Sequence, residues 1–311
     1  MLVMPRPLRL QFSAAIYHVI NRGNYRHPIF ASEGARAAFL KALDEAVMEF
    51  GWILHAFVLL NNHFHLALET PRANLTQGMH WLQSTFATRF NRYRGERGHL
   101  FQGRFQGLLV EPGPALARVV NYVHLNPVRA GLVTVAELPD YHWSSLPQFI
   151  GSNRPGYLSC REWLRELGLA DDPEGWQRYR CLLTELAEDP KRQAADGFER
   201  MTRGWSIGRD EWRQEIAAEY RALPVADAPY GPERNAIREA AWTRCLEGIL
   251  CEVGRTRAEA QAARKGVPWK VEIAARLRRE SNATHRWIAR ELYMGRPAAL
   301  RVLLSRAKRV K

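Results

Sequence analysis

The feature that most constrains the fold of this chain is a segment of strict alternation, residues 62–69, which reads Asn-His-Phe-His-Leu-Ala-Leu-Glu. In a strand, residues two apart lie on the same face. The Phe and Leu side chains are therefore expected to face a core, and His63 and His65 to face the other way. Two imidazoles at this spacing, with Cα atoms about 7 Å apart, can bind one metal ion. Two surface histidines in a strand are the alternative, and the apolar spacers favour the metal site because they fix the face on which the histidines lie.

The segments around this strand predict an alternation of strands and helices in the first half of the chain. Runs of β-branched and aromatic residues predict strands, and helical spacing of apolar residues predicts helices. The expected strands are 15–21, 52–60 and 63–69, with a further extended stretch at 100–111, and the expected helices are 33–50, 75–93 and 114–125. This order is typical of an α+β fold of ferredoxin-like type, an antiparallel sheet with helices on one face. Such a sheet leaves its other face available for a ligand.

A second candidate feature lies in the last of these helices, where Tyr122 and Asn126 are four residues apart and so share a face. Ordinary amphipathic packing explains a tyrosine at the margin of a buried stripe, and an Asn before Pro127 is ordinarily a helix stop. Together with the two histidines, Tyr122 and Asn126 could form a metal site with a nucleophile beside it. A phenol, whose pKa is about 10, becomes a useful nucleophile when a metal polarises the scissile phosphate. Two imidazoles and a carboxamide oxygen supply three ligands and leave positions for phosphate oxygens.

The charge of the chain points to a polyanionic partner. The net charge is +13 and the pI is about 10.0. Nucleic acid is the commonest partner of a soluble chain this basic, and an inert basic surface is the alternative. The charge is unevenly spread, because residues 251–311 hold 16 Lys and Arg against 5 Asp and Glu, while residues 151–250 are slightly acidic. This asymmetry predicts separate modules with separate roles.

The C-terminal residues predict an all-α region that ends in a helix-turn-helix-like module. Its elements are a helix at 269–280, a second helix from a cap at Asn282 or Thr284 to Tyr293, a tight turn at Gly295, and a basic helix at 298–308. The stretch around Pro224, Pro229 and Pro232 predicts a linker. We therefore expect three domains: a catalytic domain at 1–150, a helical middle region with the linker at 151–250, in which the sequence shows no chemistry, and a basic DNA-binding module at 251–311.

The cysteine pattern and the apolar runs of the sequence predict where in the cell the protein is located. Cys160, Cys181, Cys245 and Cys251 form no Cys-x-x-Cys pair, which argues against a zinc knuckle or a redox motif. Arg6 and Arg9 lie in the first ten residues, but the apolar core of a signal peptide does not follow them, and no apolar run approaches 18 residues. The sequence thus predicts a cytoplasmic protein with reduced thiols and no membrane segment.

Five blocks in residues 6–150 resemble the single-tyrosine HUH transposases, and most closely the branch associated with bacterial repetitive extragenic palindromes (REP). The blocks are Tyr17-His18-Val19-Ile20-Asn21-Arg22-Gly23-Asn24, Asn62-His63-Phe64-His65-Leu66, residues 98–105, residues 122–133 and Tyr141-His142-Trp143-Ser144-Ser145. Residues 204–208 also look like a segment of longer members. Members of the family often have Pro where this chain has Asn62, a departure that we do not expect to touch a ligand.

The resemblance implies a role for each candidate residue. His63 and His65 would be metal ligands, Asn126 the third ligand and Tyr122 the nucleophile, with Mg²⁺ or Mn²⁺ as the metal suited to this ligand set. Mixed aromatic and basic side chains suit single-strand binding. The candidate DNA-binding residues are Arg22, Tyr25, Arg26, Phe101, Arg104 and Phe105, with Arg301 and Arg306 in the tail. Ordinary core aromatics with a solvated rim are the alternative for Phe101 and Phe105.

The function that these features favour is a metal-dependent transposase. It would bind hairpin-forming repeats in single-stranded DNA, then cleave and rejoin them through a 5′-phosphotyrosine, without a nucleotide cofactor. A non-catalytic DNA-binding regulator, domesticated from a transposase, is the alternative from another class. A metal nuclease that uses water, and so leaves no protein–DNA adduct, is the third.

Overall fold

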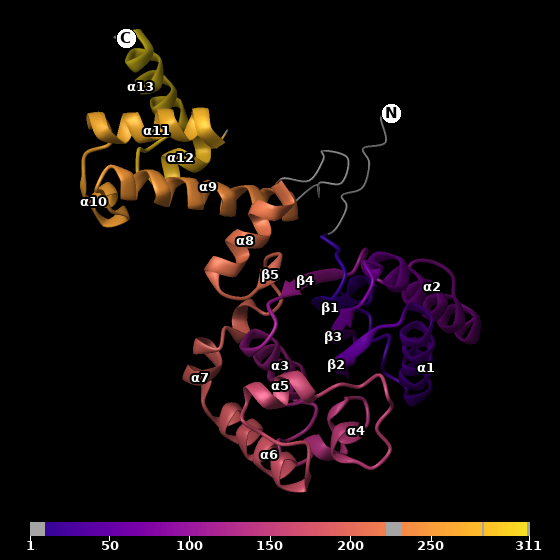
Figure 1. Cartoon of the computed structure of the whole chain (residues 1–311). Coiled ribbons are helices and arrows are strands. Elements are labelled where there is room, and N and C mark those ends of the chain that lie inside the picture. The colour runs from indigo at the N-terminus through magenta and orange to yellow at the C-terminus, as the bar shows by residue number, and fades with distance from the viewer. Residues whose placement is uncertain (1–9, 222–231, 282, 310–311) are drawn as a thin grey trace. The chain divides into compact units, whose positions relative to one another are not determined.

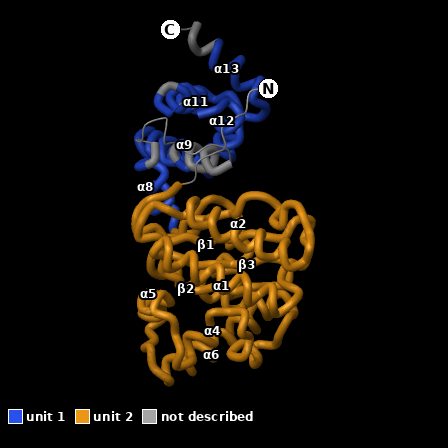
Figure 2. The backbone as a smooth tube through the Cα atoms, turned by 90° about the vertical axis from the view of Figure 1, so that its right-hand side faces the viewer, with its two compact units in different colours: residues 1–8, 209–311 blue, residues 9–208 orange. Residues whose placement is uncertain are grey.

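The computed structural model describes residues 10–221, 232–281 and 283–309, and these form two compact units that divide after Gly208 (Figure 2). The divide differs from the expected boundaries at residues 150 and 250. Residues 141–208 are part of the first unit because they pair with both edges of its sheet and pack on the helix behind it.

The first unit is built on a five-stranded sheet (Figure 1). Its strands, in sheet order, are β2 (Ile53–Leu59), β3 (His63–Thr70), β1 (Ala15–Arg22), β4 (Gln106–Val110) and β5 (Ser206–Ile207). All neighbouring pairs are antiparallel except β4 and β5, which are parallel. The α+β prediction with an antiparallel sheet is confirmed, and β5 is an additional edge strand supplied by the middle of the chain.

One face of the sheet is covered by α1 (Glu33–Phe50) and α2 (Leu75–Arg94), which pack against each other. The Ser32 side chain accepts from the Ala35 N–H at the start of α1, and Gly51 ends the helix with a φ of 66°. Aromatic rings from both helices meet the apolar face of β3, because Phe39 and Phe86 lie 5.1 Å apart and Phe39 lies 4.8 Å from Phe64 between ring centroids. The core faces this side of β3, as the alternation predicts.

The opposite face is not left open, in contrast to the expectation of helices on one face. It is covered by α3 (Pro114–Arg129), which packs on β2 and β3. The outer side of α3 is in turn covered by α5 (Arg161–Glu166) and α6 (Pro173–Glu188), so that every residue from Val119 to Pro127 is buried. A helix that is buried all round cannot show a single apolar stripe in its sequence, which is why the pattern of apolar residues leaves Tyr122 at a margin.

The helix α3 also runs past Pro127 to Arg129 instead of ending at Asn126. A proline inside a helix removes one N–H donor and strains the preceding turn. Here the turn that follows is closed by the Ala130 N–H bonded to the Asn126 carbonyl and the Leu132 N–H bonded to the Pro127 carbonyl, at 2.9 Å each. The packing around α3 therefore overrides the local helix-stop signal.

Residues 141–208 cover the edges of the sheet. The Leu59 N–H donates to the Trp143 carbonyl and the Leu54 N–H to the Tyr157 carbonyl, so both residues pair along the outer side of β2. At the other edge, the Leu109 N–H of β4 donates to the Trp205 carbonyl. The short elements between residues 138 and 208 and in the β1–α1 connection are η1 (Asn24–Arg26), η2 (Leu138–Asp140), α4 (Leu146–Ile150), α7 (Pro190–Ala195) and η3 (Phe198–Arg200).

The second unit is helical throughout its described residues and has its own apolar core around Trp242, Leu246, Leu277 and Trp287. Its elements are α8 (Asp210–Arg221), α9 (Pro232–Glu252), α10 (Arg257–Ala262), α11 (Pro268–Ser281), α12 (His285–Glu291) and α13 (Pro297–Arg309). Thr284 caps α12 through the Trp287 N–H, and Gly295 has a φ of 82° in the turn before α13. Asn282 and the predicted linker residues Pro224 and Pro229 lie outside the described residues, while Pro232 begins α9. None of the helices in the described ranges is both long and apolar enough to cross a membrane.

Candidate active site

The two histidines of β3 lie on the face of the sheet that α3 covers. Their ring centroids are 5.1 Å apart, and in the register of the sheet His65 is opposite Ile20 and His63 is opposite Arg22 of β1. His65 is 1% exposed and His63 is half-buried. The alternation in the sequence thus places both imidazoles on one face, with His63 nearer the solvent.

His65 contacts a third histidine that no sequence pattern identified as part of a site. The Nε2 atom of His18, in β1, lies 3.0 Å from Nδ1 of His65, and the two rings stack with centroids 5.1 Å apart. Nδ1 of His18 lies 2.9 Å from the backbone oxygen of Met201. Nε2 of His65 is buried and has no hydrogen-bond partner among the described residues. An orphaned imidazole nitrogen in a polar, enclosed place is what a metal ligand looks like before the metal is bound.

His63 is held in the same manner by its neighbour in sequence. Its Nδ1 lies 2.7 Å from Oδ1 of Asn62, and Nδ2 of Asn62 donates to the backbone oxygen of Arg26 at 3.2 Å. Asn62, at the position where the resembling family often has Pro, therefore contacts the candidate ligand His63 through its side chain. The loop that presents the Arg26 carbonyl is tight, with positive φ values at Tyr25 and Arg26. A Cβ at Gly23 would lie 2.4 Å from the His27 oxygen, so this turn requires glycine.

Both histidines are neutral at physiological pH, the form that binds metal. Burial, assisted by the positive charge of Arg22, lowers the pKa of His63 to about 4. Burial also lowers the pKa of His65 well below its usual range, with smaller contributions from His18, His63 and Arg22. Burial lowers the pKa of His18 to about 4, although its bond to the Met201 carbonyl acts in the other direction.

Tyr122 of α3 lies against this histidine cluster. Its ring centroid is 5.6 Å from that of His65 and 5.7 Å from that of His18, both in edge-on geometry. The side chain is 6% exposed. Burial raises the pKa of Tyr122, while the charge of Arg129, a hydrogen bond with the Asn126 side chain and the charge of Arg22 lower it in part. The phenol is thus protonated at neutral pH and lies next to two guanidinium groups that favour its anion.

Asn126 lies one turn after Tyr122 and is also buried. Its Nδ2 donates to the Tyr122 backbone oxygen at 3.0 Å, which leaves the carboxamide oxygen as the atom that can bind a metal. Within the described residues no group of three His, Cys, Asp or Glu side chains is arranged to hold a metal. The carboxamide oxygen of Asn126, which does not belong to those residue types, remains the third ligand atom that the sequence predicts.

The middle of the chain, in which the sequence shows no chemistry, contributes to the site. The Phe198 ring is edge-on to Tyr122 at 5.4 Å, and the Arg129 guanidinium lies over both rings, 5.5 Å from Tyr122 and 5.4 Å from Phe198. Together with the Met201 carbonyl, these contacts bring residues 198–201 against the histidines and the tyrosine. Phe198 and Met201 have no sequence signal, because nothing in their local pattern distinguishes them from core residues.

The predicted DNA-binding residues of the first unit lie in different environments. Arg22 is half-buried on the histidine face, and Tyr25 and Arg26 are exposed in the loop that follows. Phe101 packs 6.1 Å from Phe64 on the side of α1 and α2, Phe105 is buried and Arg104 is exposed. In the second unit, Arg301 is exposed on α13, and the side chain of Arg306 lies outside the described part of the chain.

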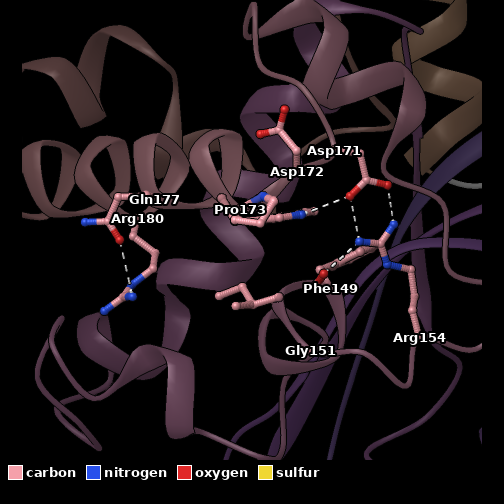
Figure 3. A pocket seen from close by; sticks show the side chains of 10 residues that line it. Phe149, Gly151, Arg154, Asp171, Asp172, Pro173, Gln177 and Arg180 are labelled. Atoms are coloured by element: carbon pink, nitrogen blue, oxygen red, sulfur yellow. Dashed lines mark hydrogen bonds and ion pairs between the residues drawn. The ribbon is translucent and has the colours of Figure 1, made fainter.

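A hollow elsewhere in the first unit does not have the features of a reactive site. Between α4 and α6, the Arg154 guanidinium lies 5.2 Å from the Phe149 ring and 5.4 Å from the Trp176 ring. Figure 3 shows Arg154 facing the carboxylate of Asp171, to which it donates twice, at 2.5 and 2.8 Å. This bond holds the pKa of Asp171 down at about 2. Because both amino groups of Arg154 bond to Asp171, we interpret this cluster as a clamp between the segment after α4 and the segment before α6.

Comparison with known proteins finds a family match in the part of the chain that contains His63, His65, Tyr122 and Asn126. Residues 11–126 match the family described as "Transposase IS200 like". Among solved structures, the chain is similar to one described as "Structure of the REP associates tyrosine transposase bound to a REP hairpin", at 16% sequence identity and a TM-score of 0.41, over 50% of this chain and 90% of that chain. No curated protein sequence matches this chain with significance.

Proposed function

We infer, from the match of residues 11–126 to the IS200-like transposase family, that the protein cleaves and rejoins single-stranded DNA with Tyr122 as the nucleophile. The observation that carries the proposal is the position of Tyr122, whose ring lies 5.6 Å from His65, an imidazole with a buried and unpartnered Nε2. A nucleophile beside an available metal-ligand atom is the arrangement that phosphoryl transfer requires.

We propose that His63 and His65 bind the metal through Nε2 and that Asn126 binds it through its carboxamide oxygen. Mg²⁺ or Mn²⁺ suits a set of nitrogen and oxygen ligands with open positions. Such an ion, when bound, polarises the scissile phosphate and stabilises the charge that develops on its oxygens.

The chain itself supplies the nucleophile and the positive charge. Tyr122 Oη bonds to phosphorus and gives up its proton, the bond from phosphorus to the 3′ oxygen breaks, and that oxygen takes up a proton. The product is a 5′-phosphotyrosine, and its reversal rejoins a strand without ATP. The charges of Arg22 and Arg129 lower the pKa of Tyr122, so they stabilise the phenolate as it forms.

The substrate we propose is single-stranded DNA that carries hairpin-forming repeats. Arg22 lies on the histidine face beside His63, where a phosphate on the metal would be within its field. The next residues on the chain, Tyr25 and Arg26, are exposed and offer a stacking surface and a charge to the strand that leaves the site. The REP-type repeat and the single-strand preference belong to this proposal.

A covalent adduct on a denaturing gel tests the proposed function. Wild-type protein with Mn²⁺ and single-stranded hairpin DNA should give a protein–DNA adduct, and Tyr122→Phe should bind the DNA without forming it. Tyr141→Phe is a matched control, because Tyr141 is also a buried tyrosine of this unit, but its hydroxyl donates to the Leu59 carbonyl. Adduct formation by Tyr122→Phe would refute the assignment. Binding without any adduct in the wild type would favour a non-catalytic regulator, and cleavage without an adduct would favour a nuclease that uses water.

A further inference from the structure

Each proposed metal ligand is held from behind by one side chain, which is itself held by a backbone carbonyl. For His63 the connection runs through Asn62 to the carbonyl of Arg26, and for His65 it runs through His18 to the carbonyl of Met201. The two connections come from opposite ends of the first unit. Arg26 is near its beginning, while Met201 lies 183 residues after His18 and outside the segment that matches the transposase family.

The Met201 carbonyl, at the end of the His18 connection, determines which atom donates in each hydrogen bond of that connection. A backbone carbonyl can only accept, so Nδ1 of His18 must carry a proton. A neutral imidazole has one protonated nitrogen, so Nε2 of His18 is an acceptor. The atom that it faces, Nδ1 of His65, must then be the donor. The remaining nitrogen of His65, the buried Nε2, is left with its lone pair and without a proton.

The same logic holds for His63 and provides an internal check. Nδ2 of Asn62 donates to the Arg26 carbonyl, which places the amide oxygen toward His63. Nδ1 of His63 is therefore the donor, and its Nε2 has the free lone pair. Two unrelated anchors thus give both histidines the same tautomer, in which Nε2 is the ligand atom.

We propose that His18 is a positioning residue, which fixes His65 in the tautomer with a free Nε2 lone pair and takes its own orientation from the Met201 carbonyl. This inference rests on the proposed function in one respect, that His65 is a ligand. If His18 did not accept from Nδ1 of His65, the buried ring of His65 could carry its proton on Nε2. The Nε2 atom would then have no lone pair with which to bind a metal. The segment around Met201 consequently completes the site, although the family match ends at residue 126.

The tautomer can be measured in the metal-free, full-length wild type. Long-range ¹H–¹⁵N correlation spectra of ¹⁵N-histidine-labelled protein distinguish a protonated ring nitrogen from an unprotonated one, and a His65→Ala sample assigns the signals of His65. We expect Nδ1 to be protonated and Nε2 unprotonated in both His18 and His65. A proton on Nε2 of His65 would overturn the proposal, whether or not any variant folds.

A pair of substitutions separates the hydrogen bond from ring packing. His18→Phe keeps a ring but offers no acceptor, and His18→Gln offers an oxygen near the position of Nε2. Loss of such a partner typically weakens metal affinity by about 10- to 100-fold. We expect a loss of that size for Mn²⁺ binding by His18→Phe, measured by electron paramagnetic resonance of free Mn²⁺, together with Nε2 protonation of His65. His18→Gln should recover most of the affinity.

The outcomes distinguish this inference from the proposed function. Wild-type Mn²⁺ affinity in a folded His18→Phe variant, or equal losses of Mn²⁺ affinity in both variants, would refute the positioning role. Neither result would bear on Tyr122 as the nucleophile. The expected tautomers and Mn²⁺ affinities in a wild type that forms no DNA adduct would support the positioning role and refute the proposed function.

Discussion

The two imidazoles of β3 share one face of the sheet, but they differ in whether water can replace them as hydrogen-bond partners. His65 is 1% exposed and faces the buried Nε2 atom of His18, whereas His63 is half-buried and bonds to Asn62, which water can reach. Removing His65 leaves a buried acceptor without its donor, a change that costs about 1–3 kcal/mol. Removing His63 lets water bond to Asn62 in its place.

The first residue-scale prediction follows from this difference. His63→Ala and His65→Ala should both abolish the metal-dependent adduct, but only His65→Ala should lower the free energy of unfolding, by about 1–3 kcal/mol. Asn126→Ala should reduce adduct formation less, because it removes a neutral oxygen ligand. Adduct assays with and without excess EDTA and urea unfolding curves measure both effects. An unchanged rate in EDTA would rule out a role for the metal.

A second residue-scale prediction concerns acid. Burial lowers the pKa of His18 to about 4 and that of His124 to about 3, whereas both have a pKa near 6.5 in the unfolded chain. Between these limits the unfolded state binds more protons than the native state, so stability rises with pH. The free energy of unfolding of the metal-free protein should therefore fall as the pH drops from about 6.5 to about 4. A flat profile for the wild type would contradict the burial of neutral histidines.

At the scale of elements, α3 is the part of the fold on which the site depends. Its outer side carries a buried polar network, in which Nδ1 of His124 lies 2.8 Å from the Tyr179 hydroxyl and Nε2 lies 2.9 Å from Oγ of Ser145. The Tyr179 hydroxyl also donates to Oδ1 of Asn121 at 3.0 Å. The network joins α3 to α6 and so fixes the rotation of the helix that carries Tyr122 on its other side.

We predict that Tyr179→Phe will destabilise the protein by about 1–3 kcal/mol, because it removes the buried partner of Nδ1 of His124 and of Oδ1 of Asn121. Tyr157→Phe is the control: its hydroxyl bonds to Asp44 at a half-exposed position, where water can substitute. Thermal and urea unfolding of the two variants should show the larger loss for Tyr179→Phe. Equal losses of unfolding free energy in the two variants would mean that the buried network stabilises the protein no more than a single half-exposed hydrogen bond does.

The elements that sequence predicts well are those whose signals are local. The helix expected at 33–50 is α1, and the strand expected at 63–69 is β3 with one more residue, since caps, glycine and alternation act within a few residues. The signals fail where distant packing decides. The expected stop at Asn126 is overridden by α5 and α6, and β5 is a two-residue strand that has meaning only beside β4.

The candidate site divides in the same way. His63, His65, Tyr122 and Asn126 are candidates from spacing and from resemblance, because residues of these types at these spacings form a pattern within a single element. His18 and Met201 are linked across 183 residues through a backbone oxygen, which any residue could supply. Phe198 and Arg129 act through ring contacts that also occur in ordinary cores. Such positioning groups become visible only when the fold places them.

At the scale of the whole molecule, the candidate active site and the basic C-terminal residues belong to different compact units. The site residues all precede residue 209, and residues 251–311 hold 16 Lys and Arg against 5 Asp and Glu. Several of these cations are neutralised within the unit, since Arg255, Arg257, Arg276 and Arg290 form ion pairs with carboxylates. Arg286, Arg296 and Arg301 are exposed on α12, the following turn and α13.

We predict that the second unit adds affinity for DNA because these three arginines neutralise phosphates. Deleting residues 251–311 is a poor test, because it would remove the helices that bury Leu246 and Ile249 of α9. Substituting Arg286, Arg296 and Arg301 by Gln keeps the core intact. For every phosphate that an arginine no longer neutralises, the log–log salt dependence of binding should flatten by about 0.9 on a duplex and about 0.7 on a single strand.

A control of equal charge decides whether position or net charge matters. Substituting Arg161, Arg178 and Arg180 by Gln removes the same charge from exposed positions on α5 and α6. We expect a flatter salt slope on hairpin DNA for the α12–α13 variant only, with both variants still forming the adduct at low salt because the site residues are untouched. Equal slopes in wild type and the α12–α13 variant would show that these arginines do not bind DNA. Adduct formation faster than wild type in that variant would instead assign the basic unit a restraining role.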